Sequence, residues 1–232
     1  EEPAEPEEPE EPDDAEEPDD RPDVDPADYP TTATEWGERV TGVKTRMDTD
    51  EPVVALTFDA CGGSNGVGYD EQLIDFLHAE SIPATLFFNH RWIVANEALF
   101  VQLAAEPTFE VANHGWEHRP LSVNGNSIYG LTGTADPAGV IDEVMTCQEA
   151  IEERTGLWPR YFRAGTAYCD EVAVRIVNDL GLDVVNFDVL GDAGATYTAA
   201  QVTAALDGAT AGSIALLHMN QPGSGTAEGV RR

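Results

Sequence analysis

Residues 53–63 read VVALTFDACGG, an apolar run that ends in an aspartate, a cysteine and two glycines. The unbroken apolar character of residues 53–59 is typical of a strand buried on both faces of a parallel sheet. Beyond it, the chain alternates strand-like and helix-like patterns, which predicts successive βαβ units. We therefore expect an α/β fold with a parallel sheet.

The other elements follow from apolar periodicity and from the positions of glycine and proline. Further strands are predicted at residues 83–88, 109–112, 161–163, 183–187 and 213–217. Helices are predicted at residues 69–81, 92–105, 138–155, 170–180 and 199–206. Residues 121–137, rich in Gly, Asn and Thr, predict a long loop, and Gly156 is a typical helix end.

Polar side chains recur where the predicted strands end. In chain order they are Asp59, Asn89, His114, Arg163, Asp188 and His218. In a barrel of βα units, the chemistry lies at the carboxyl-terminal face of the strands. The pattern therefore predicts one functional site at that rim.

Acidic residues dominate the composition, with 44 Asp and Glu against 12 Lys and Arg, for a formal net charge of −32. This balance excludes a nucleic-acid reader, because phosphate binding needs clustered basic residues. It also argues against docking on an anionic membrane surface. No apolar stretch approaches the roughly 20 residues of a membrane span, and we expect a monomer.

Much of the acidity belongs to residues 1–28, a Pro/Glu-rich segment that we predict to be a disordered spacer, because it cannot bury enough apolar surface to fold. Residues 29–232 form the predicted catalytic domain. Their own acidity is consistent with a high-salt habitat or with genomic base composition. The spacer favours an exported, extracellular or cell-surface protein whose signal or anchor segment is absent from this chain. Three cysteines without CxxC spacing predict no disulfide framework.

Two histidines, His114 and His118, are spaced i, i+4 and on a helical turn would share one metal ion. Asp59 follows an apolar strand, where a carboxylate serves as a cap, a general base or a metal ligand. His218 follows another buried strand. A lone histidine there is usually a core residue, but the shared rim favours a general acid.

Five short segments resemble, in order, the motifs of the polysaccharide deacetylase family, the NodB-homology domains of carbohydrate esterase family 4. They are residues 57–59, His114 with His118, residues 162–165, Asp188 to Asp192, and residues 216–218. The resemblance implies a distorted (β/α) barrel that binds one divalent metal ion, often Zn²⁺. No helix or strand pattern follows His218, and the last strand of the barrel is not visible. We expect either that the sequence is truncated or that the barrel is open at one seam.

The resemblance also implies roles for individual residues. Asp59 would be the base and Arg163 its support. His218 would be the acid, held by Asp192, which we favour over Asp188. His114 and His118 would bind the metal. Apart from the resemblance, the aromatic side chains of Tyr168 and Trp116 are our candidates for stacking on sugar rings, although Trp116 is about equally compatible with core packing.

One position departs from the family pattern, because the second, metal-binding aspartate is Ala60 here. A catalytic zinc ion is usually bound by three protein ligands and a water, and His114 and His118 supply only two of the three. Asp59 could bind the metal as well as act as base, which is the outcome we favour. Cys61 or Asp70 could supply the third ligand instead. In the third outcome, metal binding is weak and catalysis is impaired.

The predicted function is metal-dependent hydrolysis of acetyl groups from an N-acetylated or O-acetylated polysaccharide, with the amide of N-acetyl sugars as first choice. The alternative is a catalytically impaired glycan-binding domain. A third interpretation is a hydrolase of non-sugar amides on the same barrel.

Overall fold

The computed structural model describes residues 22–232; residues 1–21, most of the predicted spacer, lie outside the described residues. The end of that segment is described. Its 3₁₀ helix η1 (Pro26–Asp28) begins at Asp25, whose carboxylate accepts a hydrogen bond from the Ala27 N–H. Val24 packs against a buried apolar cluster. Packing against the core therefore begins before residue 29, where the catalytic domain was predicted to start.

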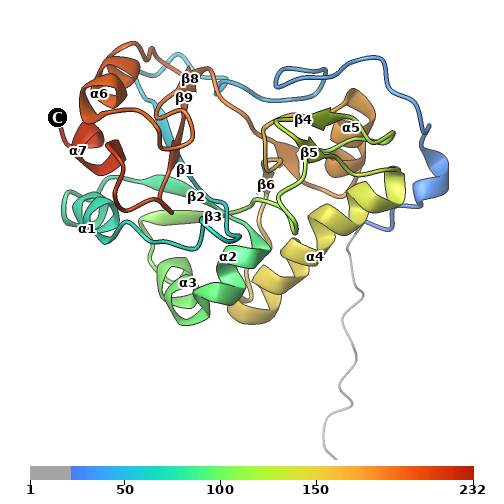
Figure 1. The fold of residues 1–232 in the computed structure, drawn as a ribbon, viewed down its shortest axis with the longest axis horizontal. Coiled ribbons are helices and arrows are strands. Elements are labelled where there is room, and N and C mark those ends of the chain that lie inside the picture. The colour runs from blue at the N-terminus through green and yellow to red at the C-terminus, as the bar shows by residue number, and fades with distance from the viewer. Residues whose placement is uncertain (1–21) are drawn as a thin grey trace, which may run out of the picture.

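A seven-stranded parallel sheet forms the centre of the molecule, in the order β7-β6-β3-β2-β1-β9-β8 (Figure 1). Its strands are β1 (Ala55–Ala60), β2 (Ala84–Phe88), β3 (Phe109–Asn113), β6 (Tyr161–Phe162), β7 (Asp183–Val184), β8 (Val189–Leu190) and β9 (Ile214–His218). The sheet is curled into a half-barrel with helices packed outside it. The predicted distorted (β/α) barrel is confirmed.

Helices connect the strands and cover the outside of the curled sheet (Figure 1). They are α1 (Glu71–Ala79), α2 (His90–Ala95), α3 (Glu97–Ala104), α4 (Pro137–Thr155), α5 (Glu171–Asp179), α6 (Ala199–Asp207) and α7 (Thr226–Val230). Asp70, Asp136 and Asp170 accept hydrogen bonds from backbone N–H groups at the starts of α1, α4 and α5. Gly156 ends α4 with a φ of 70°, as predicted.

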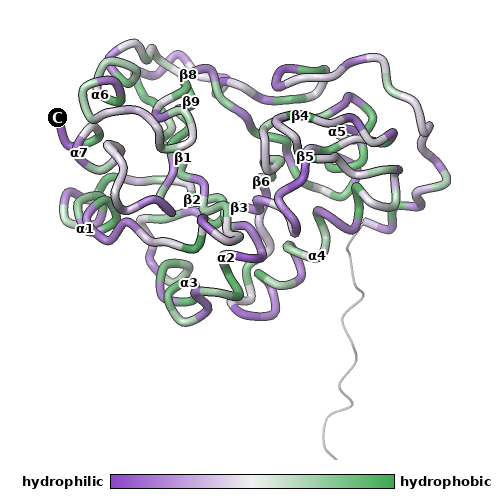
Figure 2. Tube along the Cα trace, viewed as in Figure 1, coloured by the Kyte–Doolittle hydropathy of each residue, from purple (hydrophilic) through white to green (hydrophobic). Residues whose placement is uncertain are grey.

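The core follows from the apolar pattern of the strands. β9 is apolar along most of its length (Figure 2). Its first four residues are buried. Phe58, Leu217 and Trp92 belong to one cluster between the sheet and its outer helices. A second cluster lies under α4 and α5 and includes Val144 and Val177. Among residues 22–232, no helix has the length and hydropathy that a bilayer span requires.

Four element predictions were wrong. The helix expected at 92–105 is two helices, because Asn96 adopts a non-helical φ of −133° between them. The loop expected at 121–137 contains the hairpin β4 (Ser127–Ile128) and β5 (Leu131–Thr132). The strand expected at 183–187 ends at Val184, and β8 follows it. Helix α7 was not predicted.

The gap between the two outer strands of the half-barrel is spanned by residues 44–47. Lys44 forms a parallel bridge to Val185, beyond β7, and Arg46 forms an antiparallel bridge to Ser213, before β9. Arg46 also pairs with Asp188. A segment from before the first strand therefore partly closes the seam.

Candidate active site

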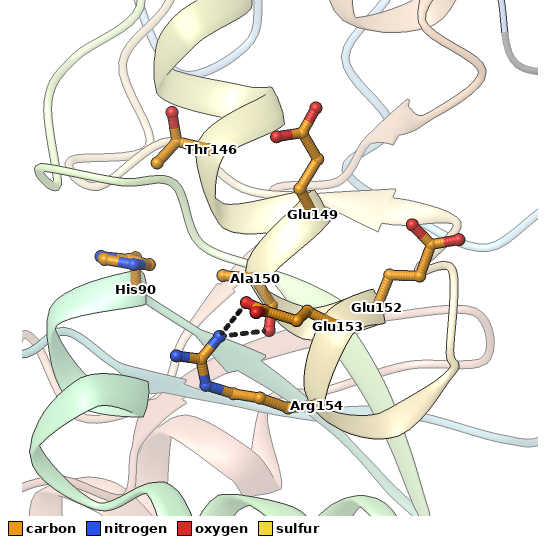
Figure 3. Close-up of a pocket in the computed structure, with 7 residues that line it drawn as sticks. All are labelled: His90, Thr146, Glu149, Ala150, Glu152, Glu153 and Arg154. Carbon is orange, nitrogen blue, oxygen red and sulfur yellow. Dashed lines mark hydrogen bonds and ion pairs between the residues drawn. The ribbon is translucent and has the colours of Figure 1, made fainter.

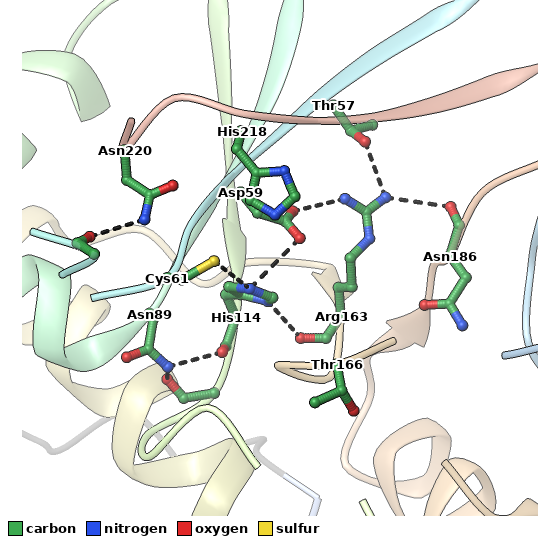
Figure 4. Close-up of polar contacts among 12 residues, drawn as sticks. Thr57, Asp59, Cys61, Asn89, His114, Arg163, Thr166, Asn186, His218 and Asn220 are labelled. Atoms are coloured by element: carbon green, nitrogen blue, oxygen red, sulfur yellow. Dashed lines mark hydrogen bonds and ion pairs between the residues drawn. The ribbon is translucent and has the colours of Figure 1, made fainter. Parts of the chain in front are cut away.

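Polar residues from four strand ends meet at one rim of the half-barrel (Figure 4). Asp59 of β1 and His218 of β9 are register partners in adjacent parallel strands. His114 follows β3 and Arg163 follows β6. The exception is Asp188, which was predicted at this rim. It lies instead opposite Ile214, at the start of β9, because the chain leaves β7 early and enters β8.

Arg163 is fully buried, and its guanidinium is held by hydrogen bonds to two side chains and two backbone carbonyls. Its Nη1 donates to Asp59 Oδ1 at 2.7 Å, and its Nη2 donates to the Thr57 hydroxyl at 2.9 Å. Nε and Nη2 also donate to the carbonyl oxygens of Val185 and Asn186. Such a network holds both the guanidinium and the Asp59 carboxylate in one orientation.

The charge state of Asp59 follows from these neighbours. Burial by itself would raise the pKa of Asp59, but the Arg163 guanidinium, followed by His114 and His218, outweighs it and lowers the pKa below its usual range. The carboxylate is therefore ionised at neutral pH and free to accept a proton through Oδ2.

His218 is held by a buried carboxylate. Its Nδ1 lies 2.8 Å from Asp192 Oδ1, and its backbone N–H donates to Asp192 Oδ2 at 2.7 Å. The Thr226 hydroxyl of α7 also donates to Asp192. Burial lowers the pKa of His218, but Asp192 and Cys61 outweigh it and raise the pKa well above its usual value. The imidazole therefore favours the protonated form.

His114 and His118 meet as predicted, but not on a helix. Both lie on the loop after β3, and their rings stand perpendicular with centroids 4.9 Å apart. His118 has a φ of 62°, a strained conformation for a residue with a side chain. Gly165 allows the neighbouring chain to approach, since a Cβ there would lie 2.4 Å from the His118 carbonyl carbon.

The loop that carries His118 is anchored by Glu143, a residue the sequence analysis did not identify. Its buried carboxylate accepts hydrogen bonds from the backbone N–H groups of Glu117 and Arg119, and its carbonyl accepts one from Trp116. Burial raises the pKa of Glu143 above its usual value. The sequence carried one sign of this role, because a glutamate on the buried side of the predicted 138–155 helix needs hydrogen-bond partners.

Cys61 contributes a third donor atom at the rim. Its Sγ lies 3.8 Å from His114 Nε2 (Figure 4). Ligand atoms of Cys61, His114 and His118 all lie within 4.8 Å of one another. Burial would raise the pKa of the Cys61 thiol, but the surrounding imidazoles, His118 foremost, hold it well below its usual range.

These three donors suit a divalent metal ion. His114 Nδ1 lies 2.9 Å from the Arg163 carbonyl oxygen, which accepts only, so Nδ1 carries the hydrogen and Nε2 is free to bind a metal. His118 Nε2 is buried without a hydrogen-bond partner among the described residues. A zinc ion would satisfy both nitrogens, and one thiolate with two imidazoles is a set that zinc accepts.

The other residues considered as third ligand lie differently. Asp70 begins α1 by accepting from the Leu73 N–H, and it is not in the three-residue donor group. Asp59 is outside that group too, although its Oδ2 lies 3.5 Å from His114 Nε2. Its role as a ligand stays a prediction. Ala60 is fully buried in the apolar cluster and offers no donor.

Aromatic side chains gather beside the loop that follows Arg163. Tyr168 packs between Trp36 and Tyr129, with ring centroids 5.8 Å apart on each side. Tyr129 is at the tip of the β4–β5 hairpin and is 72% exposed. Trp116 is separate from this row and is 37% exposed, so it is not a core residue. The sugar-stacking roles of Tyr168 and Trp116 remain predictions.

A separate hollow lies along α4, between that helix and the start of α2 (Figure 3). It is lined by His90, Thr146, Glu149, Ala150, Glu152, Glu153 and Arg154. Arg154 donates to the Ala150 carbonyl and pairs with Glu153 inside it. None of the strand-end residues lines this hollow, so it is distinct from the rim.

Comparison with known proteins connects this geometry to a family. The model of the polysaccharide deacetylase family matches residues 46–185. A chitin deacetylase from Pestalotiopsis sp is 25% identical over 138 residues, which are 58% of this chain and 41% of that protein. The chain thus spans about two fifths of the length of this curated relative.

Solved structures agree on the fold. A CE4 family pseudoenzyme from Bacillus anthracis superimposes with a TM-score of 0.65 at 20% identity, over 81% of this chain and 61% of that one. A family 4 acetyl xylan esterase from Clostridium thermocellum, solved with a cobalt ion, has a TM-score of 0.58 at 24% identity, over 77% and 80% of the two chains. At these identities the likeness establishes the fold alone.

Proposed function

This chain belongs to the polysaccharide deacetylase family, and from that premise we propose that it hydrolyses the acetamido groups of N-acetylated sugars in a polysaccharide. The observation that carries the proposal is the pairing of an ionised carboxylate, Asp59, with a protonated imidazole, His218, at one rim. Each is oriented by a fully buried partner of opposite charge, Arg163 or Asp192. A large glycan substrate also supports our proposal of an extracellular site of action.

Proton removal is assigned to Asp59. Its Oδ1 is committed to Arg163, which leaves Oδ2 to accept a proton from the attacking water. The lowered pKa keeps the carboxylate ionised, and the Arg163 network prevents the side chain from turning away. His114 and His118 would hold a divalent metal, which when bound lowers the pKa of a water and polarises the acetyl carbonyl.

Proton delivery is assigned to His218. Its Nδ1–H donates to Asp192, so the opposite nitrogen, Nε2, is directed away from that carboxylate. With its raised pKa, the imidazolium carries a proton on Nε2 at neutral pH and passes it to the sugar nitrogen as the amide bond breaks. Acetate and a free amino sugar are the products.

The experiment is acetate release by the purified chain from chitooligosaccharides, peptidoglycan fragments and acetylxylan. Each of D59N and H218A is expected to lower kcat/KM by about 10²- to 10⁴-fold, the usual contribution of a general base or acid. E149A is a matched control, because Glu149 is exposed on α4 away from the rim. Full activity in either rim variant would contradict the assignment.

A second function is a glycan-binding domain without turnover. It is favoured by Ala60, and a family 4 pseudoenzyme is among the structures of the same fold. The same panel separates the two functions. Micromolar binding of chitooligosaccharides without acetate release, in the presence of Zn²⁺ or Co²⁺, would support the binding domain and reject the hydrolase.

A further inference from the structure

The donor set at the rim is completed by a thiol rather than by a second carboxylate. Strand β1 ends at Ala60, whose methyl group is buried among apolar side chains. The next residue, Cys61, turns its side chain into the rim, toward His114 (Figure 4). The donor atom that Ala60 lacks is therefore offered by the next residue, Cys61.

We propose that Cys61, His114 and His118 together bind one borderline-soft divalent ion, Zn²⁺ or Co²⁺, through Sγ and two imidazole nitrogens, and that Asp59 lies outside the ligand set. The proposal deepens the deacetylase function given above, because it names the metal centre of that same site. It stands independently of turnover, since metal binding is measurable in a chain that releases no acetate.

The spacing of the three donors is close to that of a tetrahedral zinc site. Bond lengths of 2.3 Å to sulfur and about 2.05 Å to nitrogen place ligand atoms roughly 3.3–3.6 Å apart. Cys61 Sγ and His114 Nε2 are 3.8 Å apart, and the whole set lies within 4.8 Å. The distances between the donor atoms would have to shorten by a few tenths of an ångström to about one ångström to reach tetrahedral spacing.

The loop after Cys61 is built to hold the thiol in place. Gly62 has a φ of 72°, and a Cβ there would lie 2.7 Å from the Trp92 backbone nitrogen. The Gly62 N–H donates to the Gly66 carbonyl, which closes a tight turn. Only glycine fits this approach to α2, so the turn fixes where the Cys61 side chain points.

Asp59 is better suited to proton transfer than to metal binding. Its Oδ1 is held by Arg163, a buried cation that would repel a metal ion at that oxygen. A thiolate in place of a carboxylate also changes metal preference. Sulfur ligands favour zinc and other softer ions, whereas Mg²⁺ and Mn²⁺ favour oxygen.

The test uses the whole chain, stripped of metal by a chelator and titrated with Co²⁺. A cobalt–thiolate bond produces a charge-transfer absorption in the near ultraviolet, which imidazole and carboxylate ligands do not. We expect this band in the unaltered chain and in D59N. C61A should lack the band and bind Co²⁺ at least about 100-fold more weakly, because loss of outer-shell partners alone costs 10- to 100-fold.

C169A is the matched control, because the buried Cys169 thiol contacts the Gly37 carbonyl and is not part of the three-residue donor group. It should keep the band. C61D should bind metal without the band and shift its preference toward Mn²⁺. Circular dichroism confirms that each variant is folded.

The inference is overturned if the unaltered chain binds no Co²⁺ or binds it without the charge-transfer band. It is also overturned if C61A keeps both the band and the Co²⁺ affinity of the unaltered chain. Failure of the deacetylase proposal looks different, because the band would then be present while no substrate releases acetate. If C61A releases acetate as fast as the unaltered chain, the deacetylase proposal stands and Cys61 is rejected as a metal ligand.

Discussion

Arg163 shows how one buried side chain organises the rim. It has no exposed surface, it lies over the Phe87 ring at 4.1 Å, and its donors are paired with Asp59, Thr57 and backbone carbonyls. A buried cation is tolerated because each of these contacts replaces lost water. The same contacts orient the predicted base.

Replacing Arg163 should therefore cost stability as well as activity. R163M leaves the Asp59 carboxylate buried and unpaired, and it should lower the free energy of unfolding by about 3–5 kcal/mol. Urea denaturation measures the change. R119A is the control, because Arg119 forms an exposed pair with Glu117 that should contribute less than about 1 kcal/mol. Equal effects of the two variants would show that the buried network is not stabilising.

Asp192 determines the charge of His218, which faces Asp192, Asp59 and Cys61. Since Asp192 helps to raise the pKa of His218, D192N should let that pKa fall toward its usual value. The protonated acid would then be lost at a lower pH, so the alkaline limb of the kcat/KM profile should move to lower pH. At neutral pH we expect activity to fall by roughly 10- to 100-fold.

The raised pKa of His218 also makes the stability of the fold depend on pH. A raised folded-state pKa contributes stability that is fully present below the unfolded value and is lost as pH rises through the folded value. D192N should remove that contribution. The measurement is the pH–rate profile together with the histidine titration by NMR, and an unmoved alkaline limb would show that His218 is not the acid.

At the scale of elements, α4 supports the site without supplying a ligand. Glu143 accepts hydrogen bonds from the N–H groups of Glu117 and Arg119, next to His118 on either side. A helix fixes the position of its side chains more firmly than a loop does. The strained φ of His118 therefore depends on a carboxylate from α4.

E143A should release this loop and weaken metal binding by roughly 10- to 100-fold, the range typical of groups that orient ligands. Isothermal titration with Zn²⁺ measures the affinity. E149A lies on the exposed side of the same helix and should bind as the unaltered chain does. Unchanged affinity in E143A would mean that the loop holds its shape without α4.

At the scale of the whole molecule, segments that are distant in the chain meet beside the loop that follows Arg163. Gly37, next to Trp36, pairs with Cys169, next to Tyr168, through two backbone hydrogen bonds of 3.1 and 3.0 Å. Tyr129 arrives on the β4–β5 hairpin. Three segments thus place a row of aromatic rings, Trp36, Tyr168 and Tyr129, beside the loop that follows Arg163.

This row should bind sugar rings outside the reacting unit. W36A is expected to weaken binding of a chitohexaose by about 3- to 10-fold, equivalent to roughly 1 kcal/mol of stacking, and to affect a chitobiose less. Calorimetry with D59N avoids turnover during the measurement. W158A is the control, because Trp158 lines a hollow on a different part of the surface. Equal losses for the short and the long sugar would contradict an extended row.

The fold class and most of the rim were predictable from local patterns. Residues 53–59 were predicted as a buried strand because an unbroken apolar run is typical of a strand that is covered on both faces. Asp59, His114, Arg163 and His218 followed, since parallel strands bring their carboxyl ends to one face. Asp188 was misplaced because short strands such as β7 and β8 have too few residues for a clear period.

Other features depend on contacts between residues far apart in the chain, which no local pattern encodes. Cys61 lies near His114 because β1 and β3 flank β2 in the sheet. Glu143 reaches the His118 loop because α4 packs beside it, and Trp36 meets Tyr168 through a backbone pairing. Chemistry at strand ends is thus visible in the sequence, whereas the choice among the candidate third donors Asp59, Cys61 and Asp70, and the supports of the site, depend on packing.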